Sequence, residues 1–156
     1  MQLIGDAEYV CEARRVARLI EATKTPVYLY SFEYEVDPVV VDRVAHGMDV
    51  NFVFGNNFGP PLFPAYTLGL ADLALSRAMA GYWTRFASTG TPNDDSGTSV
   101  EWPAFKHPTG DGRGADRYII LDANIRDAKR SHESRCDFWE PSYLRSITGS
   151  VPASAR

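Results

Sequence analysis

Residues 27–36 read Val27-Tyr28-Leu29-Tyr30-Ser31-Phe32-Glu33-Tyr34-Glu35-Val36, which is the clearest strand pattern in the chain. The even-numbered side chains are all aromatic or apolar, and they share one face because successive residues of a strand point to opposite sides. The other face begins apolar at Val27 and Leu29 and then becomes polar. This pattern predicts an interior strand that is covered on both faces at its start and reaches solvent at its end.

A helix is expected before this strand, at residues 7–22. Tyr9, Ala13, Val16 and Ile20 recur at helical spacing and form an apolar stripe, which Val10 and Ala17 widen. The opposite face is charged and consists of Glu12, Arg14, Arg15 and Arg18. The pattern is that of an amphipathic helix with one apolar and one charged face.

A longer helix is expected at residues 68–88. Its apolar stripe consists of Leu75, Met79, Tyr82 and Phe86. Gly90 and Pro92 follow it as stop signals. The segment between the strand and this helix has the pattern of a loop, and it contains His46 and Gly47.

The last part of the chain is expected to contain short elements. Residues 117–121 have the pattern of a strand, a second strand is expected near 124–126, and a helix is expected near 133–146. Residues 1–149 are expected to belong to one domain, and 150–156 to form a mobile tail. One or two convincing strands cannot make a self-contained sheet, so the predicted class is α/β with few strands and an incomplete sheet.

Composition excludes several classes of function. The net charge is −4, and no basic cluster is large enough to suggest binding to a nucleic acid. No apolar run approaches the roughly eighteen residues that a membrane span needs. The cysteines and histidines show no ligand spacing, so neither a metal nor a cofactor is expected. Taken alone, Cys11 and Cys136 are best interpreted as two buried free thiols.

His46 is the residue best placed for chemistry. It follows the end of the predicted strand by about ten residues and precedes Gly47. In open α/β sheets, functional groups gather outside the carboxyl ends of the strands. A histidine titrates near neutral pH, which makes it the usual proton shuttle. The same position also fits a loop histidine that only hydrogen-bonds nearby backbone, so the residues alone leave both interpretations open.

Five segments occur in a characteristic order along the chain. They are the aromatic strand Val27–Glu33, the block His46–Gly55, the long helix with its Gly-x-Pro-Asn exit (Ser76–Asn93), the turn Trp102-Pro103-Ala104-Phe105 and the late run Cys136-Asp137-Phe138-Trp139. Together they resemble the type-B carboxylesterases, the family that includes the cholinesterases and the para-nitrobenzyl esterases. The resemblance implies an α/β-hydrolase fold, of which this chain would be the C-terminal portion.

The resemblance also implies a function. The family has a catalytic serine, acid and histidine in that order along the chain, and His46 matches the histidine. No Gly-x-Ser-x-Gly elbow occurs in the sequence, so the serine, the acid and the oxyanion hole would belong to a missing N-terminal portion. The expectation is a serine-type carboxylic ester hydrolase that acts on a small-molecule ester without a cofactor. This chain alone is expected to be inactive.

Two other functions stay open, and so does the role of one residue. The chain could be one half of a split esterase, or a non-catalytic interaction module that uses a strand edge and an apolar face.

Asp49 matches the carboxylate position of the family block, where it would either support the active-site loop or form a cap or loop salt bridge. Phe52 and Phe54 are expected to pack in the core beneath the loop.

The two cysteines gain a second interpretation from the resemblance. Cys11 and Cys136 match positions that pair as a disulfide in secreted relatives. Such a bridge would tie the early helix to the last one. It would also favour a periplasmic or extracellular parent protein, because disulfides persist in oxidising compartments.

Overall fold

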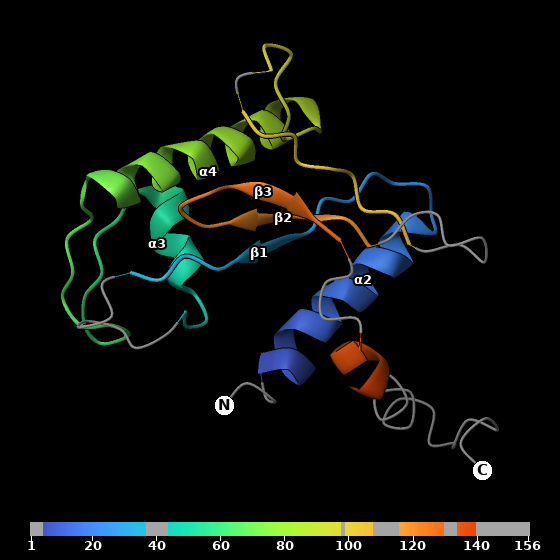
Figure 1. Cartoon of the computed structure of the whole chain (residues 1–156), viewed down its shortest axis with the longest axis horizontal. Helices are drawn as coiled ribbons and strands as arrows, with labels where there is room; N and C mark the ends of the chain where they lie inside the picture. Colours follow the sequence, from blue (N-terminus) through green and yellow to red (C-terminus); the bar gives the residue numbers. More distant parts are fainter. Residues whose placement is uncertain (1–4, 37–43, 98, 108–115, 130–133, 140–156) are drawn as a thin grey trace. The chain divides into compact units, whose positions relative to one another are not determined.

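The computed structural model describes residues 5–36, 44–97, 99–107, 116–129 and 134–139 (Figure 1). The chain divides into two compact units. The first unit consists of Met1–Leu29, Ala104–Tyr118 and Ala128–Arg156, and the second of Tyr30–Pro103 and Ile119–Asp127. His46 and Asp49 both belong to the second unit.

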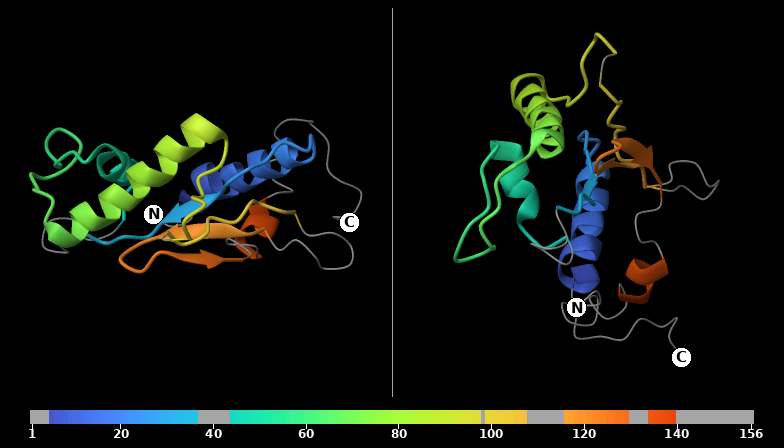
Figure 2. Two further views of the ribbon diagram at one scale, coloured as in Figure 1. Left: turned by 90° about the horizontal axis from the view of Figure 1, so that it is seen from above. Right: turned by 60° about the vertical axis from the view of Figure 1, so that its left-hand side comes forward.

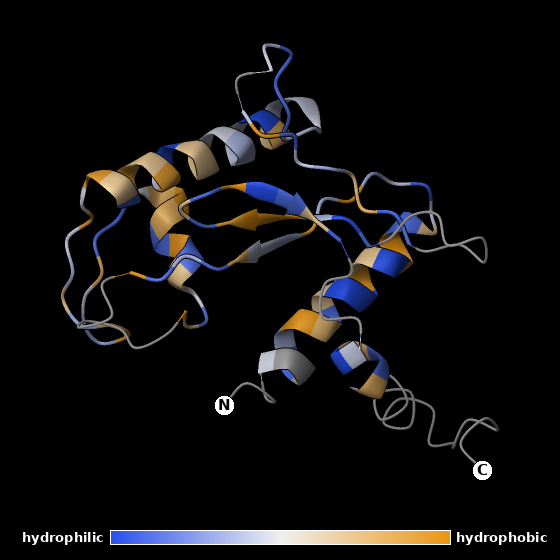
Figure 3. Ribbon diagram, viewed as in Figure 1, coloured by the Kyte–Doolittle hydropathy of each residue, from blue (hydrophilic) through white to orange (hydrophobic). Residues whose placement is uncertain are grey.

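A small sheet lies mostly in the second unit. Among the described residues its strands follow the order β1-β2-β3, with bounds Tyr30–Phe32, Tyr118–Leu121 and Arg126–Ala128. β1 and β2 are parallel, with Tyr30 beside Ile119, and β3 runs opposite to β2 (Figure 1). β2 is buried along its whole length and is visibly more apolar than β3 (Figure 3).

The strand predicted at residues 27–36 pairs regularly over a shorter stretch than its pattern suggests. β1 is three residues long, and one further hydrogen bond runs from the Glu33 N–H to the Leu121 carbonyl at 3.0 Å. Within the described residues, β1 has a paired neighbour on its β2 side alone. The ladder therefore ends where β2 ends. A partial α/β fold with few strands, as predicted, is what the structure contains.

Helix α4, Leu70–Thr89, is the long helix predicted at residues 68–88. Most of the predicted stripe is buried, namely Leu75, Met79 and Tyr82, whereas Phe86 is 49% exposed. The helix ends at Gly90, whose φ of 78° is the left-handed conformation that glycine adopts without strain. None of the described helices is both long and apolar enough to cross a membrane.

The segment predicted as a loop around His46 contains a helix that the sequence pattern did not indicate. This helix, α3, spans Met48–Phe54 and packs against α4 (Figures 1 and 2), where the Ser76 hydroxyl donates a 2.6 Å hydrogen bond to the Phe52 carbonyl. Phe52 is fully buried as expected, but Phe54 is 72% exposed, so its predicted core position is wrong. Residues two apart lie about 200° apart around a helix, so one helix face cannot bury both.

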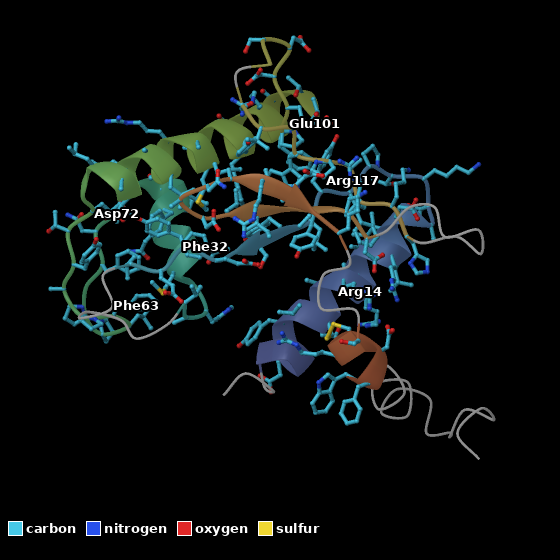
Figure 4. All side chains as sticks on the ribbon, in the orientation of Figure 1. Arg14, Phe32, Phe63, Asp72, Glu101 and Arg117 are labelled. Carbon is cyan, nitrogen blue, oxygen red and sulfur yellow. A yellow bond between two sulfur atoms is a disulfide. The ribbon has the colours of Figure 1, made fainter. Side chains whose placement is uncertain are left out.

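The shared face of the β1 region forms two aromatic groups in the second unit. Tyr30 lies edge-on to Trp83 and Trp102, with ring centroids 5.1 and 5.8 Å apart. Phe32 instead contacts Phe52 of α3, at 5.1 Å (Figure 4). The face predicted from the alternation along the strand is therefore the face that builds this core.

Trp102 is fixed by a pair of hydrogen bonds that imitates backbone pairing. The Asn93 side-chain amide donates to the Trp102 carbonyl at 2.9 Å, and the Trp102 N–H donates to Asn93 Oδ1 at 2.7 Å. Asn93 ends the Gly-x-Pro-Asn exit of the long helix, and Trp102 begins the Trp-Pro-x-Phe turn. Two of the segments that carry the family resemblance are thus joined directly to each other.

The connection from α3 to α4 closes on itself. Phe58 and Tyr66 exchange two backbone hydrogen bonds, of 2.9 and 3.2 Å. Phe63, which lies between them in sequence, packs its ring on that of Phe58 at 5.2 Å (Figure 4). Residues 59–65 therefore form a loop whose two ends are held together.

The first unit is built on the early helix. A π-helical turn, η1 (Asp6–Val10), runs into α2 (Cys11–Glu21). Cys11 forms a disulfide with Cys136, which lies in the helical residues 134–139. The structure therefore contains the disulfide that the resemblance implies, between the early helix and the last one. The rest of the helix predicted near 133–146, and the tail at 150–156, lie outside the described residues.

The face of α2 that is buried differs in part from the predicted one. Ala17, at the edge of the predicted stripe, is buried, but Tyr9, Val16 and Ile20 are 47%, 44% and 40% exposed, and Arg14 of the charged face is buried instead. The apolar periodicity correctly predicts a helix here, but the charged side carries its most buried residue. The reason lies in a residue far away in the sequence.

Arg14 is buried because Asp116 is buried (Figure 4 labels Arg14). The Asp116 carboxylate is inaccessible to solvent and accepts hydrogen bonds from Arg14 Nε at 2.6 Å and Arg18 Nη2 at 3.0 Å. Arg14 Nη1 also lies 3.2 Å from Asp137, and His107 Nδ1 lies 3.5 Å from Asp116. A buried carboxylate requires hydrogen-bonded cations, so α2 turns Arg14 and Arg18 toward Asp116.

Removal of the Cys11–Cys136 bridge should destabilise the chain. The bridge spans 125 positions, and on the chain-entropy model a closed loop of about a hundred residues contributes about 4–5 kcal/mol. We expect the double variant Cys11→Ser/Cys136→Ser to lose about 2–5 kcal/mol of unfolding free energy in urea titrations. Ellman titration of the unfolded, unreduced protein should find no free thiol, and two free thiols would show that the bridge is absent.

Arg14 and Arg15 form a matched pair for testing the buried charge cluster. Arg14→Met should lower the free energy of unfolding by about 3 kcal/mol, because it removes one partner of a buried ion pair. Arg15 pairs with Glu12 at 2.7 Å in a partly exposed contact, so Arg15→Met should cost less than about 1 kcal/mol. Equal losses in urea denaturation would contradict the assigned burial of Arg14.

Candidate active site

His46 lies at the exposed corner of a tight turn that leads into α3. The Met48 N–H donates to the Ala45 carbonyl at 3.2 Å and closes the turn. Gly47 has φ 84° and ψ 0°, the values of the third residue of a type II turn. Residues with a side chain adopt this conformation only with strain. Gly47 is therefore a backbone requirement of the turn that presents His46.

Met48 anchors this turn from its buried side. The Met48 side chain is fully buried, and its sulfur accepts a hydrogen bond from the Ala45 N–H at 3.0 Å. The Val50 N–H donates to the Gly47 carbonyl at 3.3 Å. The turn and the start of α3 are consequently one hydrogen-bonded segment, with Met48 buried beneath it and His46 on the exposed side.

Asp49 connects this segment to the sheet. Its carboxylate accepts a 2.7 Å hydrogen bond from the Tyr30 hydroxyl of β1. Burial raises the pKa of Tyr30 above its usual value, and the hydrogen bond to Asp49 and the charge of Asp49 raise it further. The hydroxyl therefore remains a donor well above neutral pH. Asp49 also lies in the first turn of α3, where a carboxylate complements the helix dipole.

A second tyrosine–aspartate contact lies at the start of α4. The Asp72 carboxylate accepts hydrogen bonds from the Tyr34 hydroxyl at 2.6 Å, the Tyr66 hydroxyl at 2.7 Å and the Gly69 N–H at 2.7 Å (Figure 4 labels Asp72). Burial acts to raise the pKa of Asp72, but these hydrogen bonds outweigh burial and lower it overall. The cluster ties the segment after β1 to the start of α4.

The structure separates the predicted residues into two groups. His46 and Asp49 lie within one turn of chain in the second unit, whereas Cys11 and Cys136 belong to the first unit. Tyr30 was not predicted as a site residue, and its signal in the sequence is limited to its place on the aromatic face of the strand. Among the described residues, no group of three or more His, Cys, Asp or Glu side chains is arranged to hold a metal ion.

These features first define a class: an α/β fold in which an exposed histidine turn follows a strand of the sheet. Comparison with known proteins identifies the family within this class. The model of the carboxylesterase family matches residues 1–139. Carboxylesterase 5A of Homo sapiens is 33% identical over 148 residues, which cover 89% of this chain and 24% of the relative. The chain belongs to the carboxylesterase family.

Two further comparisons agree with this assignment. The medium-chain fatty acyl-CoA hydrolase precursor of Anas platyrhynchos is 31% identical over 142 residues, covering 87% of this chain and 23% of the relative. A crystal structure of a carboxylesterase from Geobacillus stearothermophilus has a TM-score of 0.60 at 26% identity, covering 80% of this chain and 24% of that chain. The chain thus spans about a quarter of the length of the curated relatives it matches.

Gly47 and Gly59 form a matched pair for testing the histidine turn. An added Cβ would meet no atom within 4 Å at either position, but only Gly47 of the two has a left-handed φ. Gly47→Ala should therefore lower the unfolding free energy by about 1–2 kcal/mol through backbone strain alone. Gly59→Ala should leave it unchanged or raise it by about 0.4–1 kcal/mol. Urea denaturation measures both, and equal effects would contradict the assigned turn.

Proposed function

We propose that this chain carries the catalytic histidine of a serine-type carboxylic ester hydrolase, and that His46 is that histidine. Membership of the carboxylesterase family supports the chemistry. The observation that carries the residue assignment is the turn at His46–Gly47, which exposes the imidazole through a conformation that Gly47 permits. An exposed imidazole on a defined turn is what a general base needs in order to reach a substrate.

In the proposed reaction His46 moves a proton in both directions. A serine hydroxyl attacks the ester carbonyl carbon while the His46 imidazole takes the hydroxyl proton, and backbone N–H groups stabilise the oxyanion. The imidazolium then protonates the leaving alcohol as the ester C–O bond breaks, which leaves an acyl-enzyme. Water, deprotonated by the same imidazole, releases the carboxylic acid and restores the serine.

The other members of this machinery are assigned to residues outside the 156 of this sequence. The sequence has no Gly-x-Ser-x-Gly elbow. The acid that orients the imidazole and the oxyanion-hole donors have no matched residue here either. Asp49 is proposed to support the histidine turn, where its carboxylate accepts a 2.7 Å hydrogen bond from the Tyr30 hydroxyl. The proposed substrate is a small-molecule carboxylic ester.

The disulfide supports a proposal about location. Cys11 and Cys136 are bridged, and disulfides persist in oxidising compartments. We therefore assign the protein to which these residues belong to the periplasm or the extracellular space.

The proposed function predicts an inactive chain and an active complete enzyme. The 156-residue chain should hydrolyse para-nitrophenyl acetate no faster than its His46→Gln variant, because it holds no nucleophile for the imidazole to activate. In the protein encoded by a longer reading frame that contains these residues and the serine of a Gly-x-Ser-x-Gly elbow, His46→Gln should lower kcat by at least about 1,000-fold.

Two controls make this test specific. His107→Gln, which changes a histidine of the first unit, should leave kcat in the longer reading frame unchanged. A fluorophosphonate probe should label the serine in the parent and in His107→Gln, and label it far more slowly in His46→Gln. Full turnover in His46→Gln would reject the catalytic assignment.

A second candidate function is a non-catalytic interaction module, or one half of a split esterase. The observation that favours it is the outward apolar side of η1 and α2, where Tyr9, Val16 and Ile20 are each at least 40% exposed. Concentration-dependent association in sedimentation equilibrium, without ester turnover, would support the interaction module. Ester turnover that appears on mixing with a chain bearing the elbow serine would support the split esterase.

A further inference from the structure

We propose that Tyr30 is a positioning residue for His46, acting by hydrogen-bonding Asp49 and so fixing the turn that carries the histidine. The catalytic importance of this role rests on the proposed function, but the mechanical link between strand and turn does not. Asp49 follows His46 by three positions, with Gly47 and Met48 between them. A displacement of Asp49 therefore passes directly into the turn.

The start of α3 is held by the buried Met48 side chain and, in addition, by this hydrogen bond from Tyr30. Gly47, the N-cap residue, provides no side-chain hydrogen bond to the helix. Met48 and Val50 donate backbone hydrogen bonds of 3.2 and 3.3 Å, at the long end of the normal range. The Tyr30 hydroxyl reaches Asp49 at 2.7 Å and joins this first turn to β1 of the sheet. Charge-assisted hydrogen bonds of this length are the strong ones.

Tyr30 can act in this way because its own ring is held in place. The ring packs edge-on against Trp83 of α4 and Trp102, at 5.1 and 5.8 Å. Trp102 is fixed in turn by its paired hydrogen bonds with Asn93. The hydroxyl is therefore presented to Asp49 from a rigid aromatic group. Burial raises the pKa of Tyr30 above its usual value, and Asp49 raises it further. The Tyr30 hydroxyl therefore keeps its proton and remains a hydrogen-bond donor over the working pH range.

The second unit also offers a matched control. Tyr34 donates to Asp72 at 2.6 Å, and Asp72 lies in the first turn of α4 as Asp49 lies in the first turn of α3. Tyr34→Phe and Tyr30→Phe remove the same atom from the same kind of contact. Only the Tyr30 contact is adjacent to His46, so the two variants separate a positioning effect from general destabilisation.

The experiment is amide hydrogen exchange and histidine-ring NMR on the full chain. Tyr30→Phe should accelerate exchange at Met48 and Val50 about 10- to 100-fold, as expected for losing a hydrogen bond to a charged group. It should also shift and broaden the His46 Hε1–Cε1 signal. Tyr34→Phe should instead accelerate exchange at Leu73, whose N–H donates to Gly69 at 2.9 Å, and leave the His46 signal in place.

A double-variant cycle tests whether the effect passes through Asp49. Asp49→Ala should produce the same change at His46 as Tyr30→Phe, and the double variant should add nothing further. If Tyr30→Phe does not fold, the test is made on the unsubstituted chain. Its Tyr30 hydroxyl proton should exchange slowly with solvent and show NMR contacts to Asp49. An unchanged His46 signal in folded Tyr30→Phe, an equal change in Tyr34→Phe, or a rapidly exchanging Tyr30 hydroxyl would each overturn the proposal.

These outcomes are separable from those of the esterase test. Full turnover in His46→Gln would reject the catalytic role and leave the exchange pattern as it is. A negative exchange result would reject the role of Tyr30 and leave the esterase result as it is.

Discussion

The alternation of side chains along β1 is the constraint on which the second unit depends. Tyr30 and Phe32 point to the same side but have different partners. Tyr30 contacts Trp83, Trp102 and Asp49, and Phe32 contacts Phe52. A register shift of one residue would turn both rings to the opposite face. The aromatic core and the support of the histidine turn would then be lost together. The two-residue alternation of side chains along β1 therefore determines both the aromatic core and the support of the candidate site.

The sequence predicts those elements whose pattern is local. The α4 stripe and the β1 face follow from helical and strand periodicity, and both occur in the structure. The seven residues of α3, Met48–Phe54, are rich in β-branched and aromatic types that favour strands. This helix forms because the Gly47 turn starts it and α4 packs against it. The buried face of α2 was missed because Asp116 lies 102 positions from Arg14, and no local pattern reveals such a partner.

The candidate site was only partly accessible from the sequence. His46 was found through its resemblance to a family block, since a histidine in a loop carries little weight by itself. The positive φ of Gly47 accounts for the glycine that follows His46. Tyr30 could not have been found in this way, because a tyrosine on an aromatic strand face has the same pattern whether or not its hydroxyl has a partner. The hydrogen bond between the Tyr30 hydroxyl and Asp49 identifies the role of this tyrosine, and the fold brings these two residues together.

The loop at residues 59–65, whose two ends are held together, affects how such chains can change in length during evolution. Its ends are joined by the Phe58–Tyr66 backbone pair, and Tyr66 is also tied to Asp72 at the start of α4. Extra residues inserted between them would lengthen a loop that is already closed, and closure entropy grows only slowly with length. The second unit can therefore gain or lose surface here while β1, α3 and α4 keep their places. Length variation among related chains should accordingly concentrate between Gly59 and Ala65.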